Sequence, residues 1–341
     1  MIKSWEKLIN YLWQPNILYG QMKALENLLE RIAQLRMLVI GDLMLDHYIF
    51  GDASRISPEA PVPVIDVEQE KETLGAAGNV ALNLRSVGVD VEILGSFGLD
   101  APGERLRHLL ATHAIKFDPS CQQKNIRTIL KTRVIVRNQQ LCRLDIEDLP
   151  EKYTLERNTY LEELLTKIDR YDGIIFSNYA KGTITQRIAD RVIGAAQSYG
   201  IVTAADPKPK SGIRFTGIDL LKPNKSEAFE MLENSHNHFN TDEICLSIFA
   251  KHQPKYLVIT LGQEGMLIAE NGKIVEQIAS NAREIFDVSG AGDTAIAFLT
   301  AALAAHEPIT SAAKLANLAS GIVVGKVGTA TVSTEEILGA V

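Results

Sequence analysis

The residues best suited to chemistry lie in the segment Asp287–Thr294, which reads DVSGAGDT and precedes a long apolar stretch. Gly290 and Gly292 lack side chains, so the backbone around them can approach an anion closely. If a helix begins here, its first N–H groups and the positive end of its dipole would face that anion. Asp293 would then lie in the first helical turn, where it can accept a proton from a hydroxyl group that attacks a phosphoryl group. The alternative is a glycine turn in which Asp293 only favours the helix N-terminus.

Competing phosphate-binding patterns are absent from the sequence. We find no GxxxxGK[ST] and no GxGxxG after an apolar run, and Gly321–Lys326 (GIVVGK) has the wrong spacing and lacks the Ser or Thr. The segment Asp287–Thr294 is therefore the strongest local signal for anion chemistry.

The segments that must position these residues alternate between short apolar runs and helix-like stretches. The apolar runs are Met37–Gly41, Val91–Gly95, Gly173–Ser177, Ile201–Ala205 and Tyr256–Thr260. The helix-like stretches are Met22–Leu35, Ala77–Val87, Gly103–His113, Leu155–Asp169, Thr185–Tyr199 and Asn224–Leu232. This alternation predicts an α/β fold with a doubly wound, mainly parallel sheet that is covered on both faces. Ligands of such folds bind beyond the carboxyl ends of the strands.

Two segments break the alternation, and we expect them to form a small β-lid from about residues 51–70 and 126–147. Ala60–Val67 (APVPVIDV) is interrupted by proline and is an edge strand at best. Ile129–Ile146 reads as two strands around a turn near Asn138. Period 2 puts Lys131, Arg133, Ile135 and Arg137 on one face and Leu130, Thr132, Val134 and Val136 on the other. The first face is basic enough to meet an anion, and the second is apolar and suited to dimerisation.

The composition excludes several classes of protein. Of the 341 residues, 46% are hydrophobic and 23% are charged, unlike disordered chains. A net charge of −7 argues against nucleic-acid binding, which usually requires a basic face. The three widely spaced cysteines predict neither disulfides nor a zinc site, and His236 and His238 read as loop residues. The N-terminus is a poor signal peptide and the longest apolar run, Ala295–Ala305, is too short to span a bilayer, so we expect a cytoplasmic protein with no membrane contact.

The motif DVSGAGDT resembles the C-terminal signature of the ribokinase-like carbohydrate kinases, D-[TV]-[TS]-G-A-G-D. The similarity continues in order over about residues 38–332. It includes Gly41–Val67, Arg137–Glu147 (RNQQLCRLDIE), Tyr179–Gly182 (YAKG) and Asp206–Lys208 (DPK), which resemble the branch of the family that phosphorylates heptose 7-phosphates. The resemblance implies a ribokinase-like kinase domain over residues 36–341, after an N-terminal extension and helix over residues 1–35. We predict no role for the first 21 residues.

On the nucleotide side, the resemblance implies roles for individual residues. Asp293 matches the catalytic base of the family, and Gly290, Ala291 and Gly292 match its anion hole. The residues implied in ATP binding are Asn224, Lys225, Ser226, Glu227, Thr260, Gly262, Gly265 and Asn317. Glu227, at the end of the N-x-x-E element, is expected to organise Mg²⁺ through water, as suits a small ion that keeps much of its hydration. ATP and Mg²⁺ are the expected cofactors.

On the sugar side, carboxylates after the first strand can accept hydrogen bonds from sugar hydroxyls. The expected substrate-binding residues are Asp42, Asp46, Asn79, Lys131, Arg133, Arg137, Lys181 and Lys208. The basic residues among them are candidates for the 7-phosphate, since arginine binds phosphate in a bidentate manner. Each alone could equally be a solvated surface charge, and only their clustering favours a common role.

The chain departs from the family pattern in three respects. The first glycine signature reads LGAAGNVALN rather than P-G-G-A-A-N-V, so one glycine has moved along the turn. Asn178 stands where relatives commonly carry aspartate, which removes a charge near the sugar. Some relatives continue into a nucleotidyltransferase domain, and we expect this chain to be a kinase without that fused half.

The leading hypothesis is transfer of the ATP γ-phosphoryl group to O1 of a heptose 7-phosphate, giving the 1,7-bisphosphate for ADP-heptose synthesis. A ribokinase-like kinase of another sugar or sugar phosphate is the nearest alternative. A non-catalytic regulatory protein on the same scaffold is a third. The expected partners are a small-molecule sugar phosphate, ATP and a second copy of the chain that docks through the β-lid.

Overall fold

The computed structural model describes residues 15–137, 139–156, 159–232, 240–282, 287–326 and 328–340. The histidines at 236 and 238, the turn residue Asn138 and the first 14 residues lie outside these ranges. The cysteines within them, Cys121, Cys142 and Cys245, are all free thiols.

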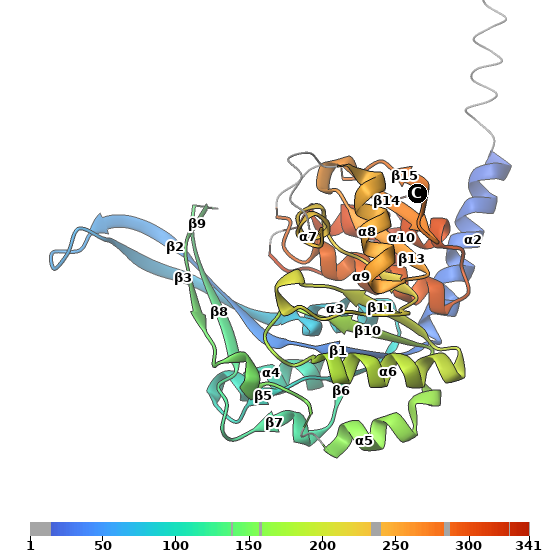
Figure 1. Cartoon of the computed structure of the whole chain (residues 1–341). Coiled ribbons are helices and arrows are strands. Elements are labelled where there is room, and N and C mark those ends of the chain that lie inside the picture. The colour runs from blue at the N-terminus through green and yellow to red at the C-terminus, as the bar shows by residue number, and fades with distance from the viewer. Residues whose placement is uncertain are drawn as a thin grey trace, which may run out of the picture.

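A nine-stranded sheet forms the body of the molecule (Figure 1). In spatial order its strands are β15 (Lys273–Ile278), β14 (Met266–Glu270), β13 (Tyr256–Thr260), β12 (Leu220–Leu221), β11 (Val202–Asp206), β10 (Gly173–Ser177), β1 (Arg36–Gly41), β4 (Asp90–Leu94) and β6 (Lys116–Phe117). Neighbouring strands are parallel from β13 to β6, and β14 and β15 are antiparallel to their neighbours. The prediction of an α/β fold with a mainly parallel sheet is confirmed.

The central strands form where the sequence has continuous apolar runs. Every residue of β10 is buried, as are the last five of β1, which fits strands covered on both faces. Each of the five predicted runs is a strand whose ends differ from the prediction by at most one residue. The antiparallel hairpin β14–β15 was not predicted, because no helix separates its two strands and it therefore breaks the alternation of strands and helices.

The helices surround this sheet. They are α2 (Pro15–Ala33), α3 (Ala77–Ser86), α4 (Ala101–Thr112), α5 (Thr159–Thr166), α6 (Gln186–Tyr199), α7 (Lys225–Glu230), α8 (Thr241–His252), α9 (Ala291–Ala304), α10 (Ile309–Val323) and α11 (Thr334–Leu338). Helix α9 is buried from its first turn to its end because it packs against α3, α10 and strands β10 and β11. Helix α2 extends N-terminal of the predicted start at Met22. Within the described ranges, no helix has the length and apolar character needed to cross a membrane.

A four-stranded sheet, which we call the lid, projects away from the body (Figure 1). Its order is β3 (Pro63–Ala76), β2 (Leu43–Ile56), β8 (Ile129–Val136) and β9 (Gln139–Ile146). The proline-bearing segment does lie at an edge, as predicted. Strands β2 and β3 extend beyond the predicted lid segment, residues 51–70, at both ends. Strand β2 begins one residue after β1 ends, and β3 runs directly into α3. Apolar residues at the base of β2 are buried in the body, whereas the tip is exposed.

The strand register places one set of polar side chains on a single lid face. Asp46 lies opposite Lys131, and Tyr48 lies opposite Arg133. Arg137 does not join this face, contrary to the prediction. Strand β8 ends at Val136, and Arg137 takes a positive φ of 49° at the turn, where the two-residue alternation no longer applies. Its side chain is exposed at the lid tip.

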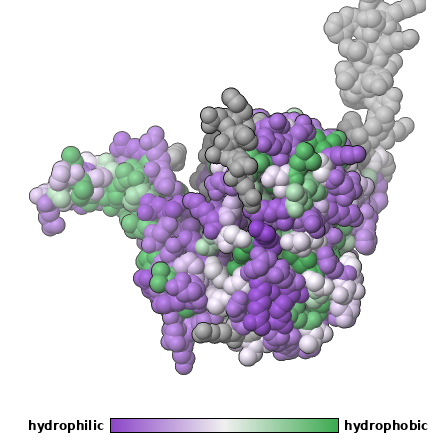
Figure 2. All heavy atoms as spheres, viewed as in Figure 1, coloured by the Kyte–Doolittle hydropathy of each residue, from purple (hydrophilic) through white to green (hydrophobic). Residues whose placement is uncertain are grey.

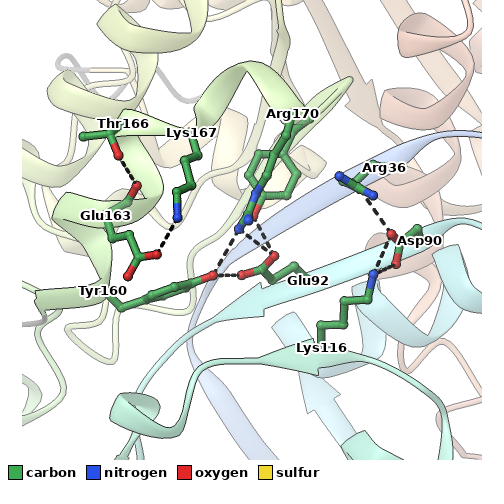
Figure 3. A network of polar contacts seen from close by, with 10 residues as sticks. Arg36, Asp90, Glu92, Lys116, Tyr160, Glu163, Thr166, Lys167 and Arg170 are labelled. Atoms are coloured by element: carbon green, nitrogen blue, oxygen red, sulfur yellow. Dashed lines mark hydrogen bonds and ion pairs between the residues drawn. The ribbon is translucent and has the colours of Figure 1, made fainter.

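A polar network closes the amino end of the sheet (Figure 3). Glu92 of β4 accepts hydrogen bonds from Tyr160, Tyr171 and Arg170, with the last two at 2.7 and 2.9 Å. Burial raises the pKa of Tyr160 to about 12, so its hydroxyl remains a donor. These contacts fasten α5 and the short helix Ile168–Arg170 to the sheet, at the end opposite the carboxyl ends of the strands.

Candidate active site

The chain reverses its direction of travel across the sheet between β1 and β10. From β1 it adds β4 and β6 on one side, and later strands β10 to β13 on the other. Ligands of open α/β sheets bind at such a switch point, beyond the carboxyl ends of the strands. A cavity of about 640 Å³ lies there and is lined by residues that follow β10, β11, β12 and β13, together with α9 and α10.

The glycine turn of DVSGAGDT begins helix α9, as predicted. Gly290 is the N-cap residue with a φ of +83°, and a Cβ there would lie 2.7 Å from the Nδ2 atom of Asn79. Glycine is therefore required for both conformation and space. Asp287 fixes the turn, since its carboxylate accepts hydrogen bonds from the N–H groups of Ser289 and Gly328 at 2.8 and 3.1 Å. Ala291 and Gly292, which are predicted to form the anion hole with Gly290, line the cavity.

Asp293 is buried in the first turn of α9 with both carboxylate oxygens engaged. Nδ2 of Asn79 donates to Oδ2 at 2.8 Å, and the hydroxyl of Tyr179 donates to Oδ1 at 2.7 Å. Burial raises the pKa of Asp293 to about 6, while these two hydrogen bonds and the charge of Lys222 act in the opposite direction. A carboxylate with this pKa is ionised near neutral pH and basic enough to accept a proton.

An ion pair that the sequence did not predict lies against the first turn of α9. Nζ of Lys222 is 3.0 Å from Oδ2 of Asp206, and the lysine is only 1% exposed. A Cβ at Gly292 would lie 3.6 Å from that Nζ. Burial raises the pKa of Asp206 to about 7, although Lys222 lowers it. The only sequence signals were the strand-end phrase DPK and the lysine that precedes the N-x-x-E element.

The N-x-x-E element forms the start of helix α7. Asn224 and Glu227 make a reciprocal capping box, in which Oδ1 of Asn224 accepts from the Glu227 N–H and Oε2 of Glu227 accepts from the Asn224 N–H, both at 2.9 Å. Oε1 of Glu227 accepts from Nζ of Lys208 at 2.9 Å. Lys208, a predicted substrate residue, therefore lies in the cavity beside the predicted nucleotide residues. Its strand, β11, ends at this part of the sheet.

Whether this site can hold Mg²⁺ depends on the oxygen ligands that its side chains offer. Both oxygens of Glu227 have protein partners, and the described part of the chain contains no group of three or more metal-ligating side chains. A Mg²⁺ ion that arrives with ATP keeps phosphate and water ligands, and one nearby carboxylate is sufficient for it. The residues present therefore fit a metal that enters with the nucleotide as part of the substrate.

The remaining predicted nucleotide residues line the same cavity. They are Lys225, Ser226, Thr260, Gly262, Gly265 and Asn317. Gly265 has a φ of +90°, and a Cβ there would meet the carbonyl oxygen of Ile278, so the loop after β13 needs glycine. Nδ2 of Asn317 donates to the carbonyl oxygen of Ala279 at 2.7 Å and thereby fixes the segment after β15 against α10.

Two predicted substrate residues hold other parts of the site in place. Asp42 is 1% exposed, and its carboxylate accepts from the N–H groups of Tyr179, Lys181 and Thr183 at 2.8, 3.1 and 3.1 Å. It therefore anchors the loop after β10. Asn79, fully buried, positions Asp293 in the same indirect way. Direct contact of either residue with a sugar stays a prediction, and the structure adds a supporting role that strand-end position did not reveal.

The lid face carries the remaining predicted cations. Arg133 donates to Oδ1 of Asp46 at 2.6 Å, and Lys181 forms an ion pair with Glu147 at 2.6 Å. Lys131 lies opposite Asp46 and Asp145 in the strand register and has no ion pair within the described ranges. Burial lowers the pKa of Lys131, and the neighbouring charge of Lys181 lowers it further. This lysine would thus gain from an anion beside it.

Of the other basic residues of the lid, Arg143 lies beside this face and Arg137 lies away from it. Arg143 of β9 lies opposite Arg133 and forms a two-point ion pair with Asp145 at 2.8 and 2.9 Å. Arg137 pairs with Asp52 at the lid tip and stands apart from the cluster. The structure therefore brings together Asp46, Lys131, Arg133 and Lys181, and separates Arg137 and Lys208 from them.

The departures from the family pattern have local structural consequences. Ala76, at the second glycine position of the pattern, has φ 50° and ψ −123°, a conformation that favours glycine. Asn178 bridges the loop after β10, because its Oδ1 atom accepts from the Ala180 N–H at 2.9 Å and its Nδ2 atom donates to Ser211 at 2.7 Å.

Comparison with known proteins identifies the family. Residues 34–337 match the sequence profile of the pfkB family carbohydrate kinases. The chain is 39% identical over 304 residues to the bifunctional protein HldE of Sulfurimonas denitrificans, and 41% identical over 303 residues to that of Methylococcus capsulatus. Each alignment covers 89% of this chain and 63% of the relative, so the chain spans less than two thirds of the length of these curated relatives.

Solved structures share the fold at low sequence identity. A putative ribokinase from Agrobacterium tumefaciens has a TM-score of 0.72 at 16% identity, covering 90% of this chain and 96% of that one. Phosphofructokinase-2 from Escherichia coli in complex with potassium has a TM-score of 0.70 at 18% identity, covering 90% and 98%. The chain belongs to the pfkB family of carbohydrate kinases, and the prediction of a ribokinase-like, ATP-dependent carbohydrate kinase is confirmed.

Proposed function

We propose that this protein transfers the γ-phosphoryl group of ATP to O1 of D-glycero-D-manno-heptose 7-phosphate, giving the 1,7-bisphosphate for ADP-heptose synthesis. The observation that carries the proposal is the position of Asp293. It lies at the start of α9 beside the cavity, and Asp46 of the lid is near enough to raise its pKa. A base in this position would lie between a nucleotide subsite in the cavity and a sugar subsite on the side of the lid.

The chemical step follows from this arrangement. Asp293 accepts the proton of the acceptor hydroxyl while the hydroxyl oxygen bonds to the γ-phosphorus. The bond from phosphorus to the β–γ bridging oxygen breaks, and its electron pair leaves with ADP. The N–H groups of Gly290–Gly292 and the ammonium group of Lys222 stabilise the charge on the transferred group. Glu227 would hold, through water, the Mg²⁺ that accompanies ATP, and that ion would neutralise phosphate charge.

The lid supports a phosphorylated acceptor over a neutral sugar. Lys131 is partly buried and forms no ion pair with a described residue, and although Asp145 and Asp46 lie near enough to favour its charge, burial still lowers its pKa, so an anion beside it would stabilise it further. Arg133 and Lys181 lie on the same side and can exchange their carboxylate partners for phosphate oxygens. The anomeric hydroxyl is the most acidic on the sugar, which suits a carboxylate base of this strength.

The lid also supports dimerisation. Hydrophobic residues gather on it in Figure 2, and its exposed apolar side chains include Ile56, Val67, Leu141, Leu144 and Ile146. Exposed apolar patches of this kind mark contact surfaces. A second copy of the chain, presenting the same patch, would bury them.

The test is release of ADP from ATP and Mg²⁺ across a panel that contains heptose 7-phosphate, fructose 6-phosphate, ribose and fructose. We expect turnover with the heptose phosphate to exceed that with the other sugars. Preference for a different sugar would refute the substrate assignment. Silence on every sugar, with ATP still bound in calorimetry, would favour a regulatory protein.

A further inference from the structure

We infer that Tyr179 is a positioning residue for the base: its hydroxyl holds one oxygen of Asp293 so that the free lone pairs face the acceptor hydroxyl. The inference rests on the proposed role of Asp293. Tyr179 belongs to the loop after β10, and neither the glycine motif nor the strand pattern identifies it as a site residue.

The carboxylate of Asp293 is held from two sides. Tyr179 donates to Oδ1 at 2.7 Å from the loop after β10, and Asn79 donates to Oδ2 at 2.8 Å from α3. One donor on each oxygen fixes the rotation of the carboxylate plane. Each oxygen keeps further acceptor capacity, so an incoming hydroxyl can still bind. Tyr179 also lines the cavity, so its ring forms part of the wall that the reacting groups meet.

The loop around Tyr179 is built to hold the residue in place. Its N–H group donates to Asp42, which also binds the next loop residues. Ala180 has a positive φ of 57°, and Asn178 accepts its N–H at 2.9 Å. Gly182 has a φ of +97°, and a Cβ there would overlap the carbonyl oxygen of Pro150. Asp42, at the end of β1, therefore holds the loop that carries Tyr179 and so fixes the position of its hydroxyl.

The charged surroundings make a neutral donor useful here. Lys222, after β12, stabilises the ionised form of Asp293, while Asp46 of β2 and Asp206 of β11 oppose it. Burial and the charge of Asp293 raise the pKa of Tyr179 well above its usual range, so the phenol stays protonated. A protonated hydroxyl stabilises the carboxylate and leaves its negative charge in place. An added cation would instead neutralise that charge.

The test is the pH dependence of kcat/KM in Tyr179→Phe. Loss of a hydrogen bond to a charged group should move the acid limb of the profile upward by about one pH unit and lower kcat by about tenfold. The acid limb moves upward because the Tyr179 hydroxyl favours the ionised form of Asp293, so its removal makes protonation of the carboxylate easier. The matched control is Tyr171→Phe, which removes a phenol–carboxylate hydrogen bond of 2.7 Å to Glu92 at the opposite end of the sheet. It should leave the acid limb in place.

A second measurement does not depend on turnover. The ¹³C carboxyl resonance of Asp293, identified by its loss in Asp293→Asn, should titrate at higher pH in Tyr179→Phe than in the wild type. An unmoved titration and an unmoved acid limb would overturn the role of Tyr179 even if Asp293→Asn is inactive. Full turnover by Asp293→Asn would instead overturn the base assignment, and with it the proposed mechanism.

Discussion

Replacing Asp293 with asparagine should abolish turnover and yet leave the folded protein at least as stable as the wild type. An amide cannot accept the proton of the acceptor hydroxyl, so kcat should fall by about 10²–10⁴-fold or more. Binding of ATP should persist, because the cavity walls and the glycine turn do not depend on the carboxylate charge.

The stability effect can be estimated from the pKa. Burial raises the pKa of Asp293 from 3.8 to about 6, a shift that corresponds to about 3 kcal/mol at most. Because the folded pKa is the higher one, the folded protein binds the proton more tightly. Stability is therefore lost as pH rises from about 4 through about 6, and the full cost applies above that. An asparagine carries no such cost.

One local conflict reduces this gain. If the new side chain keeps its oxygen towards Tyr179, its N–H₂ group faces the N–H₂ group of Asn79 across 2.8 Å. An unsatisfied buried donor costs about 1–3 kcal/mol. The net expectation at about pH 8 is a variant between equal in stability and about 2 kcal/mol more stable than the wild type.

The assay is urea denaturation of both proteins at about pH 8 and about pH 4.5, together with coupled detection of ADP. The stability of the variant relative to the wild type should decrease by about 2 kcal/mol at the lower pH, where the wild-type carboxyl is mostly protonated. A pH-independent difference, or a variant markedly less stable at pH 8, would refute the reasoning about burial. Turnover like that of the wild type would refute the assignment of the base.

Three further predictions concern other parts of the molecule. Lys131→Ala combined with Arg133→Ala should raise KM for the sugar phosphate by about 10²-fold with little change in KM for ATP, as steady-state kinetics would show, because two charge-assisted contacts are lost; equal losses for both substrates would contradict the lid assignment. Ala76→Gly should raise the free energy of unfolding in urea by about 1 kcal/mol, since φ 50° and ψ −123° suit glycine; a destabilised variant would show that the alanine is not strained. Glu92→Gln should lower that free energy by about 2 kcal/mol without altering either KM, because Arg170 loses its carboxylate far from the site; a changed KM would link the two ends of the sheet.

Periodicity and motif order predicted most of the fold. Apolar runs marked the five central strands because parallel strands covered on both faces need nearly continuous apolar sequence. Strand β2 escaped prediction. Its apolar run is interrupted by the adjacent polar residues Asp46 and His47, so it shows neither a continuous apolar run nor a two-residue alternation.

The candidate site was predicted unevenly. The start of α9 followed from glycine and helix chemistry that is local in sequence. The lid cations Lys131 and Arg133 followed from period 2 within one strand. The predicted place of Arg137 on the basic lid face was wrong because the two-residue period ends where the strand ends. The position of Lys208 was not predicted because its partner Glu227 approaches it only in the folded chain.

The sequence by itself determined the type of the central strands and of most helices, the glycine turn before α9 and the presence of a carboxylate in the first turn of that helix. These depend on neighbours a few residues apart, which share backbone hydrogen bonds and helix or strand periodicity. Only the tertiary structure decided what each polar group does. Asp42 and Asn79 became supports and Tyr179 joined the site because their partners lie more than a hundred residues away in the sequence, where only the packing of the strands and α9 brings them together. Lys222 joined it through Asp206, which ends the neighbouring strand of the sheet. Packing also raised the pKa of Asp293 by taking it out of water, which no local pattern in the sequence encodes.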